Sequence, residues 1–228
     1  MSDALDDLDL RGAPPPPLGA ALEAELRAMP PGPIATRRPP RQVALIIAVS
    51  LGWAMAMVGL LTVRADLDEL PRGWLVAYLA AWLGAFAVPT TLLVVPARGS
   101  MLPRWAPAAA VAAVATLGFV VGGLALAEHG PSSLHRGLAS WAGCLSTGLA
   151  TAVVPMLLLG LALRGVAPTA TRATAVAIGA AAGAVGGFML HLHCPIADGM
   201  HLGVIHGGVA VIAAGVGGLL LPRWLEAR

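Results

Sequence analysis

The sequence predicts an all-α integral membrane protein, a bundle of six transmembrane helices with a short, largely disordered cytoplasmic N-terminal arm. Two observations predict this class. The chain is 57% hydrophobic and only 11% charged, with a mean hydropathy of +0.80, whereas roughly 25% of the residues in ordinary soluble domains are charged. The acidic residues are also clustered, and the stretches between them are long enough to cross a bilayer, which takes about 20 apolar residues per helix.

The first 42 residues differ in composition from all that follow, with aspartate-rich and proline-rich runs around one helical stretch at 18–29. The apolar residues of this stretch fall on one face of a helix. We expect the arm to be mostly disordered alone and to become ordered when this apolar face meets a partner. The predicted domains are therefore an arm at 1–42 and a membrane domain at 43–228, and the apolar face consists of Leu18, Leu22, Leu26 and Met29.

Six apolar stretches follow the arm, and they predict transmembrane helices at 43–63, 74–95, 106–127, 141–163, 173–192 and 201–221. The first begins too far from the N-terminus to be a cleavable signal peptide. An even number of spans puts both termini on one side of the membrane. Nine arginines lie near that side and three near the other, which predicts cytoplasmic termini in a bacterial inner membrane. The nine are Arg37, Arg38, Arg41, Arg98, Arg104, Arg164, Arg172, Arg223 and Arg228, and the three are Arg64, Arg72 and Arg136.

Several function classes are disfavoured by what the sequence lacks. The formal net charge of +2 is small and dispersed, which does not fit a nucleic-acid surface. No acidic or basic residue lies deep in a predicted span, which argues against a proton-coupled transporter and disfavours a small-solute channel or transporter. The chain has no Walker loop, GxSxG elbow or HExxH motif, so we do not expect an enzyme.

Glycines are spaced four residues apart in the last two predicted spans, a spacing that lets helix backbones approach closely. Gly179, Gly183 and Gly187 lie in the fifth span, and Gly203 and Gly207 lie in the sixth. We expect these helices to be tightly packed.

The two cysteines are expected at similar depth on the periplasmic side. Cys144 lies about one turn inside the start of the fourth span, and Cys194 lies at the end of the fifth. Because a short loop joins these spans, they are expected to pack as an antiparallel hairpin whose far ends meet where the cysteines are. A disulfide is compatible with this arrangement but not required by it, and the periplasm is oxidising enough to form one.

Four of the six histidines lie around Cys194, at His191, His193, His201 and His206. Thiolate and imidazole ligands together suit zinc, copper or another soft ion. The spacings match no standard zinc motif, however, and each histidine alone fits an interfacial polar group bonded to backbone or water. Together with the cysteines, the four indicate a redox or metal-responsive site. Both interpretations remain open at this point.

The motifs assembled so far resemble those of the NrsF family, polytopic membrane anti-sigma factors described as negative regulators of sigma F. The shared features are a leucine-bearing helix before a Pro/Arg segment, an Arg-x-Asp-Leu in the first periplasmic loop, a cysteine and a later proline in the fourth span with its cytoplasmic loop, and a Leu-His-Cys-Pro. In this chain the leucine-bearing helix contains Leu22 and Leu26 and precedes the Pro/Arg segment at 33–41. The Arg-x-Asp-Leu motif is Arg64 to Leu67, and the Leu-His-Cys-Pro motif is Leu192 to Pro195. The cysteine and the later proline of the fourth span are Cys144 and Pro155, and the cytoplasmic loop that follows is at 163–168. The acidic extension at 1–17 departs from the family pattern.

The resemblance implies that the cytoplasmic arm holds an extracytoplasmic-function (ECF) sigma factor at the membrane and that Cys144 and Cys194 sense oxidants or heavy-metal ions. The candidate partner-binding residues are then Leu18, Leu22, Leu26, Met29, Arg37 and Arg38. The alternative is a membrane metal-binding or redox protein, in which the histidines and cysteines of the periplasmic face hold an ion as cofactor.

Overall fold

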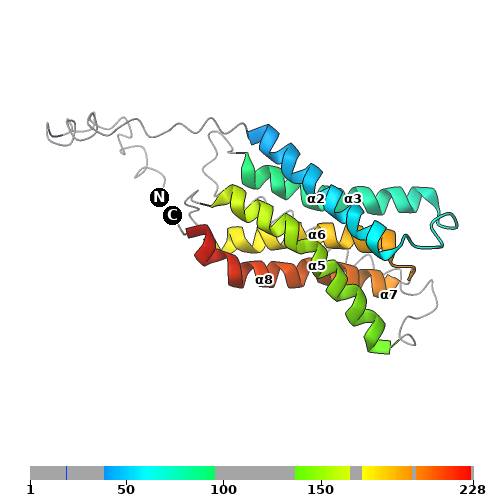
Figure 1. Ribbon diagram of the computed structural model, residues 1–228. Coiled ribbons are helices and arrows are strands. Elements are labelled where there is room, and N and C mark those ends of the chain that lie inside the picture. Colours follow the sequence, from blue (N-terminus) through cyan, green and yellow to red (C-terminus); the bar gives the residue numbers. More distant parts are fainter. Residues whose placement is uncertain (1–18, 20–38, 96–136, 165–170, 197–198, 227–228) are drawn as a thin grey trace, which may run out of the picture. The chain divides into compact units, whose positions relative to one another are not determined.

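The computed structural model describes residues 19, 39–95, 137–164, 171–196 and 199–226, and these residues form helices and their connections (Figure 1). Five helices are long and apolar enough to cross a membrane. The elements are α2 (Pro39–Leu61), α3 (Arg72–Val94), α5 (Gly137–Leu163), α6 (Thr171–His193), and a C-terminal run made of α7 (Gly199–His201), the π-helix η3 (Leu202–His206) and α8 (Gly207–Glu226).

The predicted all-α class and five of the six predicted spans are confirmed as helices. The observed bounds differ from the predicted ones by a few residues at most ends, and the last run continues to Glu226 rather than ending at 221. The predicted span at 106–127 lies outside the described residues, as do the arm residues 1–18 and 20–38. The chain is therefore a multi-pass membrane protein with five candidate spans in its described part.

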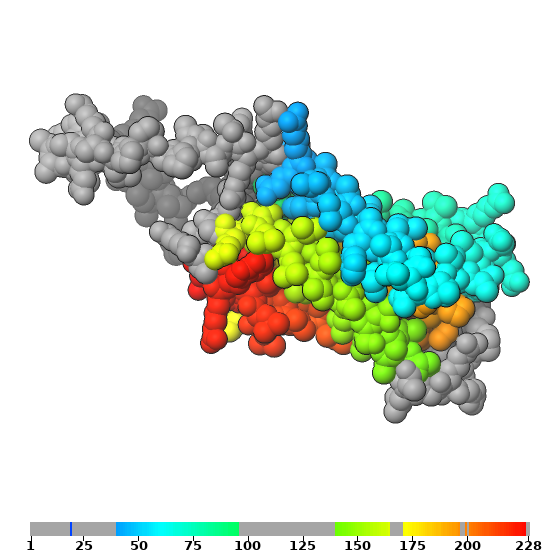
Figure 2. Space-filling model, viewed as in Figure 1, coloured from blue at the N-terminus to red at the C-terminus, as the bar shows by residue number. Residues whose placement is uncertain are grey.

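Helix α6 lies at the centre of the described bundle, where it packs against α2, α3, α5 and α8. In its apolar stretch 78% of the residues are buried inside the protein, against 28% to 50% in the other four helices. Alanine and glycine make up much of α6, so neighbouring helices approach it from all sides. In Figure 2, the surface facing the viewer is formed mainly by α2, α3, α5 and α8, and α6 is largely covered.

The contact between α6 and α8 brings backbone against backbone. A Cβ atom added at Gly179 would overlap the carbonyl group of Ala213, and one added at Gly183 would lie 2.5 Å from the Cα of Ala210. The predicted tight packing of the last two helices is therefore confirmed at these glycines. Gly187 makes room for a different helix, because a Cβ atom at this position would meet the indole ring of Trp82 on α3.

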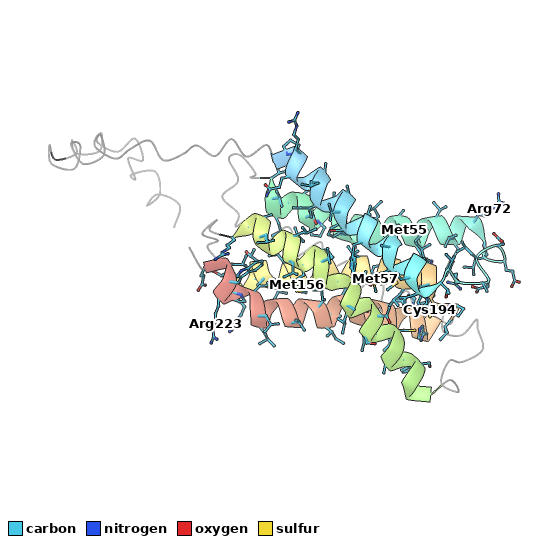
Figure 3. The ribbon with its side chains drawn as sticks, viewed as in Figure 1. Met55, Met57, Arg72, Met156, Cys194 and Arg223 are labelled. Atoms are coloured by element: carbon cyan, nitrogen blue, oxygen red, sulfur yellow. The ribbon has the colours of Figure 1, made fainter. Side chains whose placement is uncertain are left out.

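The two ends of the bundle differ in chemistry. Helices α2 and α6 end, and α3 and α5 begin, at the end that carries the cysteines, which we call the cysteine end (Figures 1 and 3). The opposite end, called the arginine end, carries the exposed side chains of Arg41, Arg164, Arg172 and Arg223. Figure 3 shows Cys194 and Arg223 at opposite ends.

A substitution at Gly183 tests the α6–α8 contact. Gly183→Ala is expected to lower the thermal denaturation midpoint of the detergent-solubilised protein, because the added methyl meets backbone that cannot move aside, and such overpacking costs about 1 to 3 kcal/mol. Gly215→Ala on α8 is the matched control, since a Cβ there meets nothing within 4 Å. Equal midpoints for the two variants would contradict the packing described here.

Candidate functional site

Three elements meet at the cysteine end and bring the two cysteines together. Cys144 lies in the second turn of α5, and Cys194 is the first residue after α6. The backbone N–H of Cys194 still donates to the carbonyl of Leu190, at 2.7 Å, so the last helical turn holds this cysteine in place. The following Pro195 has no N–H to extend the helix, and the chain turns towards α7.

The thiols are in contact. The Sγ atoms of Cys144 and Cys194 are 3.6 Å apart, and both cysteines are free. The Nε2 atom of His201 lies 3.3 Å from the Sγ of Cys194. Cys194 and His201 are 1% and 0% exposed, whereas Cys144 is only partly buried.

This geometry suits two reactions. The thiols are close enough to form a disulfide if the sulfur atoms approach each other by about 1.5 Å, given a bond length of about 2.05 Å. The ligand atoms of Cys144, Cys194 and His201 also lie within 4.8 Å of one another. In a tetrahedral zinc site two sulfur ligands are about 3.8 Å apart and a sulfur and a nitrogen about 3.5 Å apart, which is close to the observed spacings.

The environment of Cys194 favours its neutral form. The hydrogen bond with Cys144 and burial both raise the pKa of the Cys194 thiol above its ordinary value. A buried neutral thiol is a poor nucleophile, because the thiolate is the reactive species. Of the two thiols, Cys144 is therefore the less buried one, and Cys194 is the one whose surroundings keep it neutral.

The other candidate histidines lie near this group without joining it. His191 is buried against the rings of Trp74 and Tyr78, at centroid distances of 4.8 and 5.2 Å. His206 is buried with its ring 5.3 Å from that of His201. Among the described residues, the ring nitrogens of His191 and His206 have no hydrogen-bond partner.

His193 also lies at the cysteine end, and one of its ring nitrogens bonds the residue that follows α2. Its Nδ1 atom lies 2.7 Å from the carbonyl oxygen of Thr62, so the ring N–H donates to the end of α2. The site residues that the structure brings together are therefore Cys144, Cys194 and His201, while His193 ties two helices to each other.

Arg64 also belongs to this end of the protein, although sequence reasoning gave it no function. Its side chain is 0% exposed and donates two hydrogen bonds to the Asp66 carboxylate, at 2.7 and 2.8 Å. The guanidinium lowers the pKa of Asp66, so the pair stays ionised until the pH falls below the usual aspartate value of about 3.9. The feature of the sequence that could have pointed to Arg64 is the Arg-x-Asp pattern at the end of an apolar span.

The candidate partner-binding residues cannot be placed in the same way. Their roles remain predictions, because Leu18, Leu22, Leu26, Met29, Arg37 and Arg38 all lie outside the described residues.

Comparisons with known proteins agree with the resemblance drawn from the sequence. Residues 28–226 match the family described as NrsF, Negative regulator of sigma F. The chain is 31% identical over 197 residues to the anti-sigma-F factor NrsF of Caulobacter vibrioides (strain NA1000 / CB15N), which covers 82% of this chain and 89% of that protein. No solved structure matches the chain.

Oxidation of the purified protein tests the thiol contact. Diamide is expected to convert Cys144 and Cys194 into an intramolecular disulfide, because the sulfur atoms already touch. After the protein is denatured in SDS, its free thiols are blocked with N-ethylmaleimide and its disulfides are then reduced, polyethylene-glycol maleimide should add twice to each wild-type monomer. Cys144→Ser and Cys194→Ser should each give no addition. A disulfide-linked dimer of the wild type, or no protected thiols, would contradict the contact.

Proposed function

This chain belongs to the NrsF family, and on that premise we propose that it is an inner-membrane anti-sigma factor whose periplasmic thiols control its hold on an ECF sigma factor. The observation that carries the proposal is the family match over 28–226, which spans the thiol pair and all five described helices. Cys144 and Cys194 form the input, and the N-terminal arm forms the output.

The chemistry of the two ends of the bundle supports an orientation in the membrane. The described arginine end carries four arginines against Arg64 and Arg72 at the cysteine end, which favours a cytoplasmic arginine end by the positive-inside rule. In the described part, α3 ends at the arginine end and α5 begins at the cysteine end, which supports one further crossing between them. We assign that sixth crossing to 106–127, which leaves both termini in the cytoplasm.

In the proposed mechanism, the arm binds the sigma factor through its apolar face and the arginines that follow it. The face is Leu18, Leu22, Leu26 and Met29, and the arginines are Arg37 and Arg38. An amphipathic segment of this length is marginal as a free helix, so binding and folding would occur together.

In the proposed mechanism, the two thiols react with either of two kinds of signal. With a hydroperoxide, the two thiols lose two electrons and two protons, an S–S bond forms, and the peroxide O–O bond breaks to give an alcohol and water. With a soft divalent metal ion, both thiols release their protons and bind the ion as thiolates. In both cases Cys144 on α5 and Cys194 after α6 become joined.

Release requires that the modified protein bind the sigma factor less well than the resting protein. A hundredfold loss of affinity corresponds to about 2.7 kcal/mol of coupling between the two faces of the membrane. That is within the range of known allosteric couplings.

Substitutions in the arm test the output. Leu22→Ala/Leu26→Ala in the full-length protein is expected to reduce, by at least tenfold, co-purification of an ECF sigma factor from the same organism. Leu10→Ala, outside the apolar face, serves as the control and should leave co-purification unchanged. Undiminished capture by the double variant would rule out this face as the contact.

Substitutions of the cysteines test the input. Cys144→Ser and Cys194→Ser are each expected to abolish induction of a sigma-dependent reporter by oxidant, because neither variant can form the S–S bond. Immunoblots of the membrane fraction should show the same amount of protein as in the wild type. Normal induction in both variants would refute thiol sensing.

A second candidate function, resident metal binding, is favoured by the Cys144, Cys194 and His201 group. Reduced protein incubated with Zn²⁺ and then desalted should retain about one equivalent, and Cys144→Ser or His201→Ala should reduce it to below one tenth, because a site of this type needs at least three protein ligands. His193→Gln is the control, since His193 is not part of the group formed by Cys144, Cys194 and His201. Equal retention by all variants would show that the metal binds elsewhere.

A further inference from the structure

Three hydrogen bonds join the end of α2 to the end of α6. The N–H of Arg64 donates to the carbonyl of Leu192 at 3.0 Å, and its Nη1 donates to the carbonyl of His191 at 3.3 Å. In the opposite direction, the Nδ1–H of His193 donates to the carbonyl of Thr62 at 2.7 Å. We call this set of residues the α2–α6 clamp: Thr62, Arg64, His191, Leu192 and His193.

The clamp is held in a single arrangement. The Arg64 guanidinium is buried and bonded to Asp66 on one side and to α6 on the other, so this rigid, planar group cannot move without leaving donors unpaired. Thr62 has a φ of 121°, a region that β-branched residues avoid. Such strain persists only where the surroundings impose it, and here the surroundings are the hydrogen bonds of the clamp.

The clamp is directly adjacent to the thiol pair. Cys194 follows His193 in the chain, and its N–H is bonded to Leu190 within the same turn. Closing the sulfur–sulfur distance from 3.6 Å to that of a disulfide pulls this turn towards α5. The carbonyl groups of His191 and Leu192, which accept from Arg64, belong to the turn that is pulled.

The other end of α2 is continuous with the arm. The helix is 23 residues long, begins at Pro39 and ends at Leu61, immediately before the clamp. A conformational change at residues 62–64 therefore acts on α2, a rigid helix whose other end is joined to the residues before Pro39.

We propose that the α2–α6 clamp couples the thiol pair to α2: it is closed while the thiols are free, and it opens when Cys194 is joined to Cys144. Opening lets Thr62 leave its strained conformation and frees the end of α2. Arg64 and His193 are thus positioning residues for the signal. The consequence for the sigma factor rests on the function proposed above, but opening of the clamp does not.

A competing route runs through the middle of the bundle, where the indole Nε1–H of Trp53 on α2 donates to the carbonyl of Thr151 on α5, at 3.1 Å. This bond connects α2 to the helix that carries Cys144. It lies two turns from Cys144 along α5, whereas the clamp adjoins Cys194 in the chain, so we favour the clamp. Trp53→Phe removes this bond and keeps an aromatic side chain at this position.

Hydrogen–deuterium exchange of the full-length protein in nanodiscs tests the coupling without a sigma factor. When diamide forms the disulfide, the peptide containing residues 62–67 is expected to exchange at least tenfold faster, because the Arg64 amide loses its bond to Leu192. Peptides from α8 should not change, and Trp53→Phe should behave as the wild type. Complete disulfide formation with unchanged exchange at 62–67 would overturn the proposal.

A reporter experiment tests the output. In the Cys144→Ser/Cys194→Ser background, which cannot respond to oxidant, Arg64→Gln is expected to raise the sigma-dependent reporter at least fivefold without any signal. Arg72→Gln, an exposed arginine at the start of α3, is the control and should leave the reporter low. Immunoblots of the membrane fraction must show equal amounts of protein for all variants. If Arg64→Gln does not accumulate in the membrane, the hydrogen–deuterium exchange of the wild-type protein decides whether the clamp opens.

The outcomes separate the two proposals. If Leu22→Ala/Leu26→Ala raises the reporter but Arg64→Gln at full abundance does not, the clamp is overturned and the anti-sigma function stands. If oxidation opens the clamp and neither set of variants changes the reporter, the clamp is supported and the proposed function fails.

Discussion

Gly179 and Gly183 bring α6 so close to α8 that backbone meets backbone, and the rest of the structure depends on this approach. Because lipid is as apolar as a helix surface, helices in a membrane associate by such close packing rather than by hydrophobic burial. Packed on four sides, α6 holds its last residues in fixed positions. Cys194, which follows that helix, is consequently presented to Cys144 at contact distance, and the carbonyl groups before it are presented to Arg64.

The cysteine end concentrates polar groups in an otherwise apolar protein. Buried ionisable side chains in a membrane bundle are costly and usually mark function. Here the cost is offset by specific bonds for Arg64 and His193, which join two helices, and by mutual contacts for Cys144, Cys194 and His201. The arrangement combines a reactive pair with a connection to α2, which is what a sensor with its output on the other side of the membrane requires.

Hydropathy predicted the helices well, because an apolar stretch of this length in a membrane has few alternatives to a helix. The hairpin argument likewise predicted the meeting of Cys144 and Cys194. The clamp could not be predicted, since residues 62–64 and 191–193 are distant in the chain and nothing in their spacing links them. His201 and His206 were also difficult, because a five-residue spacing separates two rings on a regular α-helix, and only the π-helix η3 brings them 5.3 Å apart.

In the proposed mechanism, the state of two thiols at one end of the bundle sets the affinity for a protein at the other end. The most direct test is the dissociation constant of the purified sigma factor for the full-length protein in nanodiscs, measured with the thiols reduced and again with the Cys144–Cys194 disulfide formed. The account predicts tight binding to the reduced protein and binding at least tenfold weaker to the oxidised protein, with recovery after reduction. Equal dissociation constants for the two forms would contradict it.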